Sequence, residues 1–265
     1  MAAHNFLDNI LQQKAQEVAA RKRQCPSETL RQRILAAPPA RSLAEVLAQD
    51  GLSVIAEIKK ASPSAGVIRP DFDPKAIARS YVEAEANALS ILTDEDFFQG
   101  SLNYIAQVRE IAPCPILRKD FILDIYQLLE ARSVGADAVL LIVAALEPPL
   151  LKALLQHASE LGLDALVEVH SQAEMRIAVD AGATIIGINN RNLETFVIDL
   201  ATTEQLAPLA PKGTLLIGES GLHSADDVGR MVQAGVDAVL VGTHFMKDPD
   251  PGLALQQFKA GIAHG

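Results

Sequence analysis

Short apolar runs separated by longer amphipathic stretches recur along most of the chain. Four similar segments begin at residues 85, 134, 181 and 234, and in three of them a glycine stands where a helix would end. Each continues into an apolar run without alternation, such as Ala138-Val-Leu-Leu141. Glycine readily adopts the left-handed conformation that closes a helix, and an unbroken apolar run is typical of a strand covered on both faces. Each copy therefore predicts the end of a helix followed by a buried parallel strand.

The spacing of these copies leaves room for a second strand in each interval. The differences between the starting positions are 49, 47 and 53 residues, whereas one strand–helix unit takes roughly 20 to 30 residues. The additional strands are predicted at Ser53–Ile58, Pro115–Lys119, Asp164–Val169 and Thr214–Glu219. Helices are predicted at Leu123–Ser133, Pro148–Leu161, Gln172–Ala181 and Ala225–Ala234, the last with Ser224 as its N-cap, and a final helix from about Pro251.

Eight strands alternating with helices predict an α/β fold, a single closed (βα)8 (TIM) barrel. A doubly wound open sheet is the alternative. An open sheet that binds a nucleotide would carry a Gly-rich turn after its first strand, and the segment Glu57-Ile-Lys-Lys-Ala-Ser-Pro-Ser64 contains no glycine. We therefore favour the barrel and assign it to residues 51–265.

Residues 1–50 are predicted to form a helical extension packed on the barrel. Apolar residues at helical spacing predict an amphipathic helix: Phe6, Leu7, Ile10, Leu11 and Val18. Its basic end, Arg21-Lys22-Arg23, is interpreted as a solvated face rather than a nucleic-acid site.

Composition and charge narrow the class of protein. Of the 265 residues 49% are apolar and 21% are charged, which excludes a disordered chain. A net charge of −10 makes nucleic acid a poor partner. The longest apolar run, Ala138–Leu146, is about half of a membrane span, and the N-terminus has no signal-peptide core. Cys25 and Cys114 have no redox or zinc spacing. We expect a cytoplasmic protein without membrane association.

Polar and charged residues gather at the C-terminal ends of the predicted strands, where barrels carry their chemistry. They are Glu57, Lys59, Lys119, Glu168, Asn189, Arg191 and Glu219. Mutual ion pairing that only keeps buried charges satisfied is the alternative interpretation. Burying six charges at one end of otherwise apolar strands is costly, however, so we predict a site that supplies a proton donor and a proton acceptor together.

The loops after the last two strands contain Gly218-Glu-Ser-Gly221 and Gly242-Thr243. Barrels often bind phosphate there on backbone N–H groups, so a phosphorylated small molecule is the expected substrate. His170, His223 and His244 follow strands, but no spacing typical of a metal site is present. The residues alone leave open a Schiff base on Lys119 or Lys59.

The strand ends resemble those of the indole-3-glycerol-phosphate synthase family of tryptophan biosynthesis over nearly the whole chain. The motifs that carry the resemblance are Ile55-Ala-Glu-Ile-Lys-Lys-Ala-Ser-Pro-Ser64, Leu117-Arg-Lys-Asp-Phe-Ile122, Val167-Glu-Val-His170, Ile186-Gly-Ile-Asn-Asn-Arg-Asn-Leu193, Ile217-Gly-Glu-Ser-Gly221 and Leu240-Val-Gly-Thr243. The resemblance implies a lyase that converts 1-(2-carboxyphenylamino)-1-deoxyribulose 5-phosphate to indole 3-glycerol phosphate, carbon dioxide and water, without cofactor or metal and with no obligate protein partner.

The resemblance also implies residue roles. Lys119 is expected to be the acid that activates the carbonyl group, and Glu168 and Lys59 are expected to act in the later dehydration. The supporting residues are expected to be Glu57, Asn189 and Glu219. Substrate contacts are expected from Ser62, Arg191 and Phe121, and phosphate contacts from Ser220, Gly221, Gly242 and Thr243, again with Lys59. The alternatives are another phosphate-binding barrel enzyme, an isomerase or Schiff-base aldolase, and a non-catalytic scaffold or ligand sensor.

Overall fold

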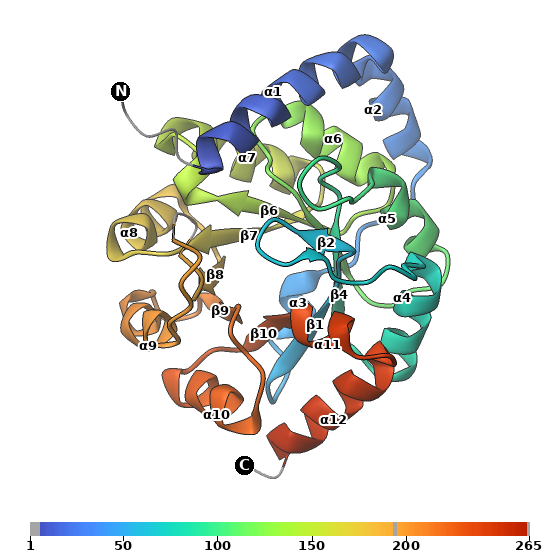
Figure 1. Cartoon of the computed structure of the whole chain (residues 1–265). Helices are drawn as coiled ribbons and strands as arrows, with labels where there is room; N and C mark the ends of the chain where they lie inside the picture. The colour runs from blue at the N-terminus through green and yellow to red at the C-terminus, as the bar shows by residue number, and fades with distance from the viewer. Residues whose placement is uncertain (1–5, 193–194, 264–265) are drawn as a thin grey trace.

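The structure, a computed structural model that describes residues 6–192 and 195–263, is built on one closed barrel of parallel strands (Figure 1). In chain order its strands are β1 (Ser53–Ile58), β4 (Ala88–Leu92), β5 (Ile116–Lys119), β6 (Ala138–Ile142), β7 (Asp164–Val169), β8 (Ile185–Asn189), β9 (Leu215–Glu219) and β10 (Ala238–Val241). Each strand pairs with the next in this order, and β10 pairs with β1 to close the ring. The predicted (βα)8 barrel is confirmed, and the open sheet is excluded.

Helices on the outside of the ring connect the strands. They are α4 (Pro74–Glu83), α5 (Leu102–Arg109), α6 (Ile125–Ser133), α7 (Pro148–Glu160), α8 (Gln172–Ala181), α9 (Ala201–Leu206), α10 (Ala225–Ala234) and α12 (Pro251–Ala263). The Ser224 cap is confirmed, since its hydroxyl accepts the Asp227 N–H in a reciprocal capping box. Helix α6 begins two residues later than predicted because the Asp124 carboxylate caps it by accepting the Tyr126 N–H.

The repeated helix-to-strand junction has the backbone conformation that its glycines predict. Gly135, Gly182 and Gly235 have φ angles of 92°, 90° and 82°. In the first copy, which lacks the glycine, Glu85 has a φ of 58°. The left-handed turn is therefore kept even where a side chain makes it unfavourable, because the apolar strand that follows must enter the barrel.

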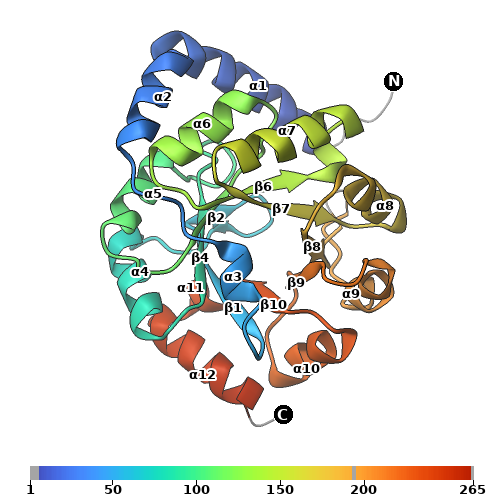
Figure 2. The same cartoon turned by 180° about the vertical axis from the view of Figure 1, so that it is seen from behind.

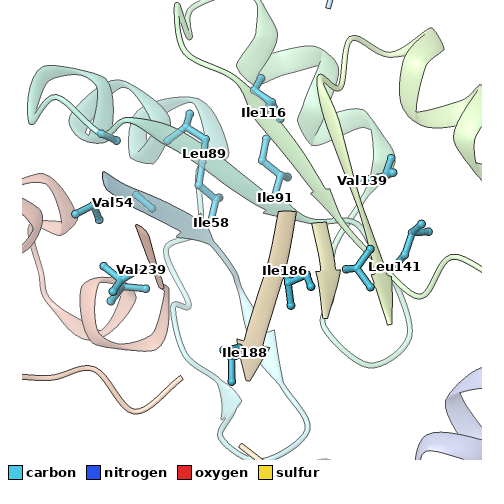
Figure 3. Close-up of a cluster of buried hydrophobic side chains, with 14 of the residues drawn as sticks. Val54, Ile58, Leu89, Ile91, Ile116, Val139, Leu141, Ile186, Ile188 and Val239 are labelled. Carbon is cyan, nitrogen blue, oxygen red and sulfur yellow. The ribbon is translucent and has the colours of Figure 1, made fainter. Parts of the chain in front are cut away.

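The core has two layers, since neighbouring residues of each strand face opposite sides. The outer layer packs between strands and helices, and Figure 3 shows part of it: Val54, Ile58, Leu89, Ile91, Ile116, Val139, Leu141, Ile186, Ile188 and Val239. The inner layer fills the barrel with Ile55, Leu117, Leu140, Leu166, Ile217 and Leu240, among others. At the C-terminal end of the strands the next inward-facing residues are the polar residues of the site, such as Lys119 after Leu117. The same alternation therefore positions both the apolar core and the polar site residues.

Three helices precede β1, where the sequence predicted one. They are α1 (Phe6–Gln24), α2 (Ser27–Ala36) and α3 (Leu43–Leu47). Helix α1 places Leu7 and Ile10 against the inner layer, as its apolar spacing predicts. Helix α3 lies across the opposite, N-terminal end of the barrel (Figure 2), where Leu43 and Leu47 pack on the inner layer from below. The Asp164 carboxylate, at the start of β7, accepts the Ala44 N–H.

No helix in the described ranges is long and apolar enough to cross a membrane. Cys25 and Cys114 are both free thiols of intermediate burial.

Candidate active site

A cavity of about 360 Å³ opens at the C-terminal ends of the strands, and every site residue predicted from the sequence lies on its wall. The wall includes Glu57, Lys59, Ser62, Lys119, Phe121, Glu168, Asn189, Arg191, Glu219, Ser220, Gly221, Gly242 and Thr243. Six charged side chains from five strand ends therefore converge on one space. The size lies within the range of small-molecule sites.

Lys119 is the centre of an ionic cluster on this wall. Its Nζ lies 2.5 Å from Glu219 Oε2 and 3.2 Å from Glu168 Oε2. Two strands away from Lys119, at the end of β1, Lys59 Nζ lies 2.5 Å from Glu57 Oε1. The three carboxylates are almost completely buried. A ligand in the cavity would therefore meet both ammonium groups and carboxylates without intervening bulk water.

Two glycines make room for the carboxylates. A Cβ at Gly187 on β8 would collide with the Glu219 carboxylate, and a Cβ at Gly242 after β10 would collide with that of Glu57. Gly187 lies on β8 next to β9, which carries Glu219, and Gly242 directly follows β10, which is next to β1 with Glu57. The missing side chains thus let two charged groups lie inside a ring that elsewhere is filled with apolar residues.

Burial and neighbouring charges shift the pKa values of Lys119, Glu168 and Glu219 by different amounts. Burial lowers the pKa of Lys119, but the charges of Glu219 and Glu168 outweigh burial and raise that pKa well above its usual range. Burial raises the pKa of Glu168, yet Lys119, His170 and a hydrogen bond from Asn189 bring it below its ordinary value. Burial is also the main influence on Glu219, whose pKa rises to about 7 despite Lys119. The cluster thus holds an ammonium, a carboxylate and a carboxyl group that titrates near neutrality.

The loops after β9 and β10 form the wall next to this cluster. Ser220 and Gly221 have φ angles of 67° and 82°, and a side chain at Gly221 would collide with Ile198. The left-handed Ser220 is an unfavourable conformation of the kind that clusters at functional sites. Thr243 begins the short helix α11 (Thr243–Lys247) with Gly242 before it. Backbone groups are thus directly accessible from the cavity on this side.

Arg191 and Ser62 lie on loops at the mouth of the cavity. The Arg191 N–H donates to Asn189 Oδ1 at 3.0 Å, and its guanidinium donates to the Phe196 carbonyl at 3.4 Å. Leu193, the last residue of that predicted motif, lies outside the described residues. Ser62 belongs to a small hairpin of β2 (Ala61–Ser62) and β3 (Gly66–Val67), which the sequence did not predict.

Much of the remaining wall is apolar, and part of it comes from residues that the sequence did not single out for the site. Helix α1 contributes Phe6, Leu7 and Ile10, and β6, the strand without a polar end, contributes Leu140 and Ile142. Phe98 and Phe196 also lie on the wall, together with His244 and Lys247 beside the Gly242 loop. No local pattern marks these four residues, because the paths of the loops bring Phe98 and Phe196 to the cavity and the placement of α11 brings His244 and Lys247 there.

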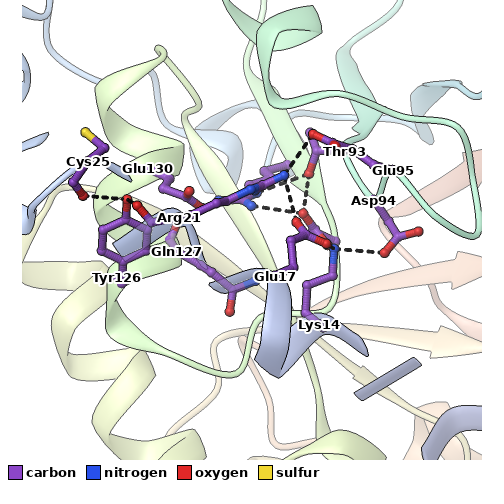
Figure 4. A network of polar contacts seen from close by, with 12 residues as sticks. Lys14, Glu17, Arg21, Cys25, Thr93, Asp94, Glu95, Tyr126, Gln127 and Glu130 are labelled. Atoms are coloured by element: carbon purple, nitrogen blue, oxygen red, sulfur yellow. Dashed lines mark hydrogen bonds and ion pairs between the residues drawn. The ribbon is translucent and has the colours of Figure 1, made fainter. Parts of the chain in front are cut away.

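A second polar network lies behind the cavity and attaches α1 to β5 (Figure 4). Lys14, which is almost completely buried, has its Nζ 2.8 Å from Asp94 Oδ2 and 2.9 Å from Asp120 Oδ1. Asp120 also pairs with the fully buried Arg118 at 2.9 Å. The two sequence neighbours of Lys119, Arg118 and Asp120, are therefore held by ion pairs outside the barrel interior.

The basic end of α1 is only partly solvated. Arg21 is half-buried and pairs with Glu17, Glu95 and Glu130, so the predicted solvated face is wrong for this residue. Glu17 is on the same helix, and the outer side of the barrel contributes the other two carboxylates, those of Glu95 and Glu130. Lys22 and Arg23 are exposed, as predicted.

The three histidines after strands occupy different surroundings. His170 lies between the carboxylates of Glu168 and Glu174. His223 and His244 contact each other edge to face with ring centres 5.8 Å apart on the cavity wall. Among residues 6–192 and 195–263, no group of three or more His, Cys, Asp or Glu side chains is arranged to hold a metal ion.

Comparisons with known proteins agree on one family. The family model for indole-3-glycerol phosphate synthase matches residues 7–258. The indole-3-glycerol phosphate synthase of Chlorobium phaeovibrioides is 51% identical over 89% of this chain and 93% of its own. That of Campylobacter curvus is 44% identical over 97% of this chain and 100% of its own.

Solved structures of similar fold are more distant in sequence. Thiamine phosphate pyrophosphorylase from Pyrococcus furiosus has a TM-score of 0.63 at 16% identity, covering 84% of this chain and 98% of its own. Tryptophan synthase subunit alpha from Legionella pneumophila has a TM-score of 0.62 at 16% identity, with 83% and 98% covered. These two likenesses support the barrel fold alone. The match of the family model and the two close relatives go further: this chain belongs to the indole-3-glycerol phosphate synthase family.

Proposed function

We propose that this chain converts 1-(2-carboxyphenylamino)-1-deoxyribulose 5-phosphate to indole 3-glycerol phosphate, carbon dioxide and water. The observation that carries the proposal is the buried Lys119 ammonium between Glu168 and Glu219, in a cavity that also offers glycine-rich loops to a phosphate. Family membership specifies the substrate. The other phosphate-binding barrel enzymes and the non-catalytic scaffold are not favoured by the relatives.

Ring closure begins when the aromatic carbon that bears the carboxylate attacks the sugar carbonyl. Negative charge then develops on the carbonyl oxygen, where an adjacent ammonium stabilises the transition state and donates a proton. We assign this role to Lys119. Glu219 and Glu168 hold its Nζ in place, and the low polarity of the buried site strengthens its effect on the developing charge.

Loss of carbon dioxide follows from the same adduct. We assign the substrate carboxylate to the mouth of the cavity, between Ser62 and Arg191, with the aromatic ring against the apolar wall near Phe121. Departure of the carboxylate as neutral carbon dioxide restores the aromaticity of the ring, so decarboxylation is favourable once the ring carbon is bonded to the former carbonyl carbon.

Dehydration completes the indole. The former carbonyl oxygen takes up a second proton and leaves as water, while the carbon next to nitrogen loses a proton. Glu168 and Lys59 are the pair that we assign to these transfers, with Glu57 holding Lys59 and Asn189 hydrogen-bonded to Glu168. Their positions on opposite sides of the cavity allow one group to act on the oxygen and the other on carbon.

The phosphate is assigned to the loops of Ser220, Gly221, Gly242 and Thr243, with Lys59 as the neighbouring cation. Backbone N–H groups at such loops bind anions without adding a side chain to the cavity. This assignment places the sugar chain between the phosphate loops and Lys119.

An assay of the purified chain tests the proposal. Incubation with the carboxyphenylamino-deoxyribulose phosphate, in buffer containing a chelator and no added metal, should produce indole fluorescence and release carbon dioxide. An absence of fluorescence, together with a borohydride-trapped adduct at Lys119 or Lys59, would instead identify a Schiff-base enzyme.

We further propose that the enzyme works in the cytoplasm, without membrane, nucleic acid or obligate protein partner. The free thiols of Cys25 and Cys114 suit a reducing compartment. All of the assigned side chains belong to this chain, which supports the proposal. Full activity at concentrations where the chain sediments as a monomer would support this; activity that requires an added protein would contradict it.

A further inference from the structure

The proposed reaction consumes one proton from solvent in each turnover. Two protons go to the departing oxygen and one is withdrawn from carbon, while the carboxylate leaves as neutral carbon dioxide. The bound substrate fills the cavity, and α1 covers the cavity with Phe6, Leu7 and Ile10. Glu168 is almost completely buried. A proton therefore needs a route to the site that the substrate does not block.

His170 lies on the far side of Glu168, and none of the steps above uses it. Its Nε2 is 3.4 Å from Glu168 Oε1, and its Nδ1 is 3.1 Å from Glu174 Oε2. The Nε2 atom is buried and makes no hydrogen bond in the structure. An imidazole nitrogen without a hydrogen-bond partner, beside a carboxylate that must exchange protons, is in position for proton transfer.

Glu174 determines which nitrogen of His170 carries the proton in the neutral form. Its carboxylate also accepts the His170 backbone N–H at 2.9 Å and the Ser171 hydroxyl at 3.1 Å. Burial raises the pKa of Glu174, but its bonds to His170 and Ser171 bring it below the ordinary value, so Glu174 is an ionised acceptor. Nδ1 must then be the donor, and the lone pair of the neutral ring lies on Nε2, toward Glu168.

The other edge of His170 reaches a second opening. A hollow of about 310 Å³ between the start of α8 and α9 is lined by His170, Ser171, Gln172, Thr202, Gln205 and Leu209, among others. Gln172, Gln205 and Leu209 are exposed, so the hollow opens on the outer surface of the barrel. The adjacent helices α8 and α9 lie side by side in both views (Figures 1 and 2). His170 thus connects the outer surface with the inner carboxylate.

We propose that His170 relays protons between the hollow of α8 and α9 and Glu168, so that the site is recharged while substrate occupies the cavity. The imidazolium gives its Nε2 proton to the Glu168 carboxylate, which becomes a carboxyl group. The neutral imidazole then turns its Nε2 lone pair toward the hollow by rotation of the ring, accepts a proton there from a water-borne acid, and turns back toward Glu168. The relay acts through Glu168 and rests on the proposed function.

The charges around His170 agree with this role. Glu168 from β7, Glu174 from α8 and, farther away, Glu219 from β9 face the ring, while α9 presents the uncharged Thr202 and Gln205. Burial lowers the pKa of His170, and these three carboxylates raise it by more. A ring whose pKa is raised by the carboxylates on both of its sides is suited to hold a proton between them and to exchange it.

Substitution with a side chain that keeps the bond to Glu174 but carries no mobile proton tests the relay. His170→Asn should lower kcat by about tenfold or more while KM stays within about twofold, since the substrate contacts remain. In His170→Ala, added imidazole should restore kcat in a saturable way, through the hollow. His157→Asn is the matched control, because His157 is half-buried on α7, outside the cavity lining, and pairs with Glu160 at 3.0 Å. This variant should behave as the unchanged chain does.

Two outcomes would overturn the relay. One is a His170→Asn enzyme with unchanged kcat and an unchanged pH profile. The other is a loss of kcat in His170→Ala that imidazole does not restore, which would make His170 a structural residue only. A readout without turnover separates this proposal from the proposed function: Glu168→Gln should lower the titration midpoint of the His170 ring nitrogens in NMR. If the unchanged chain makes no indole, the proposed function fails, whereas an unmoved midpoint removes the coupling that the relay needs.

Discussion

At the scale of single residues, burial and pairing determine what each charged group can do. Lys119 and Glu219 are in contact although they are 100 residues apart in the chain. Burial raises the pKa of Glu219, whereas the same burial is outweighed at Glu168 by Lys119, His170 and Asn189. Two chemically identical carboxyl groups thus differ in proton affinity within one site, which is the arrangement that acid–base catalysis needs.

Lys119→Ala tests the assigned acid. We expect turnover to fall by at least about a hundredfold, because the group that protonates the carbonyl oxygen is lost. The fold should persist, since Lys119 lies on the cavity wall rather than in the apolar core. Fluorescence assays and circular dichroism on the same preparation would check both statements. Near-normal turnover would remove Lys119 from the mechanism.

Glu219→Gln tests the raised pKa through stability. The folded chain binds a proton at Glu219 with a pKa of about 7, compared with an ordinary value of 4.5. The proton bound at Glu219 therefore makes its whole contribution to the free energy of unfolding below about pH 4.5. This contribution is lost as the pH rises to about 7. Because the amide does not titrate, the melting temperature of the variant relative to the unchanged chain should rise between pH 5 and pH 8.

Glu83→Gln is the control for this prediction, because Glu83 is exposed on α4. Its melting temperature should follow that of the unchanged chain across the same pH range. A parallel course for Glu219→Gln as well would mean that Glu219 is ionised in the folded chain throughout that range.

At the scale of elements, the end of β5 supplies the proposed catalytic side chain on one face and an attachment for α1 on the other. On β5 and the residue after it, Lys119 faces the cavity, while Arg118 and Asp120 pair with each other and Asp120 also pairs with Lys14 of α1. The pleat of the strand requires this division. Helix α1 thereby stabilises the strand that carries the central ammonium group, and its own apolar residues cover the cavity.

Lys14→Met tests this attachment. The change would leave Asp94 and Asp120 without their common partner, and breaking a buried ion pair in this way costs about 3–5 kcal/mol of unfolding free energy. Lys22→Met on the same helix is the matched control. Lys22 is 44% exposed and pairs with Asp124, so its loss should cost no more than about 1 kcal/mol. Denaturant unfolding of both variants would compare them; equal stabilities would mean that the network does not hold α1.

At the scale of the whole molecule, closure of the ring creates the site and leaves two open ends to cover. Helix α1 covers the cavity end and α3 covers the opposite end, where Leu43 and Leu47 are completely buried. The extension of residues 1–50 and the barrel of residues 51–265 are separate along the sequence but share one apolar core. We therefore predict that the barrel depends on the extension for stability.

Two truncations test this dependence. A chain that begins at residue 51 would expose the barrel interior that Leu43 and Leu47 cover, a loss of roughly 3–6 kcal/mol for the two leucines out of a typical total of about 5–15. We expect it to lose cooperative thermal unfolding. A chain that begins at residue 25 keeps α3 and should fold, but with a higher KM because α1 no longer lines the cavity. Cooperative unfolding of the shorter chain at the original temperature would contradict the prediction.

Local sequence accounts for the strands, the helix ends and the residues that face the barrel mouth. Runs of apolar residues and the glycines at 135, 182 and 235 act over a few residues, so their pattern is readable along the chain. Topology follows, because parallel strands joined by helices bring all their C-terminal ends to one side. This is why every predicted site residue lies on one cavity wall.

The pairings between distant side chains required the folded ring. Arg21 leaves solvent for three carboxylates, Phe98 and Phe196 reach the cavity from loops, and His170 meets Glu168 on one side and an outer hollow on the other. Each of these contacts depends on barrel register, helix packing and loop path together. Such long-range geometry has no period along the chain, because it arises from the packing of segments that are far apart in sequence.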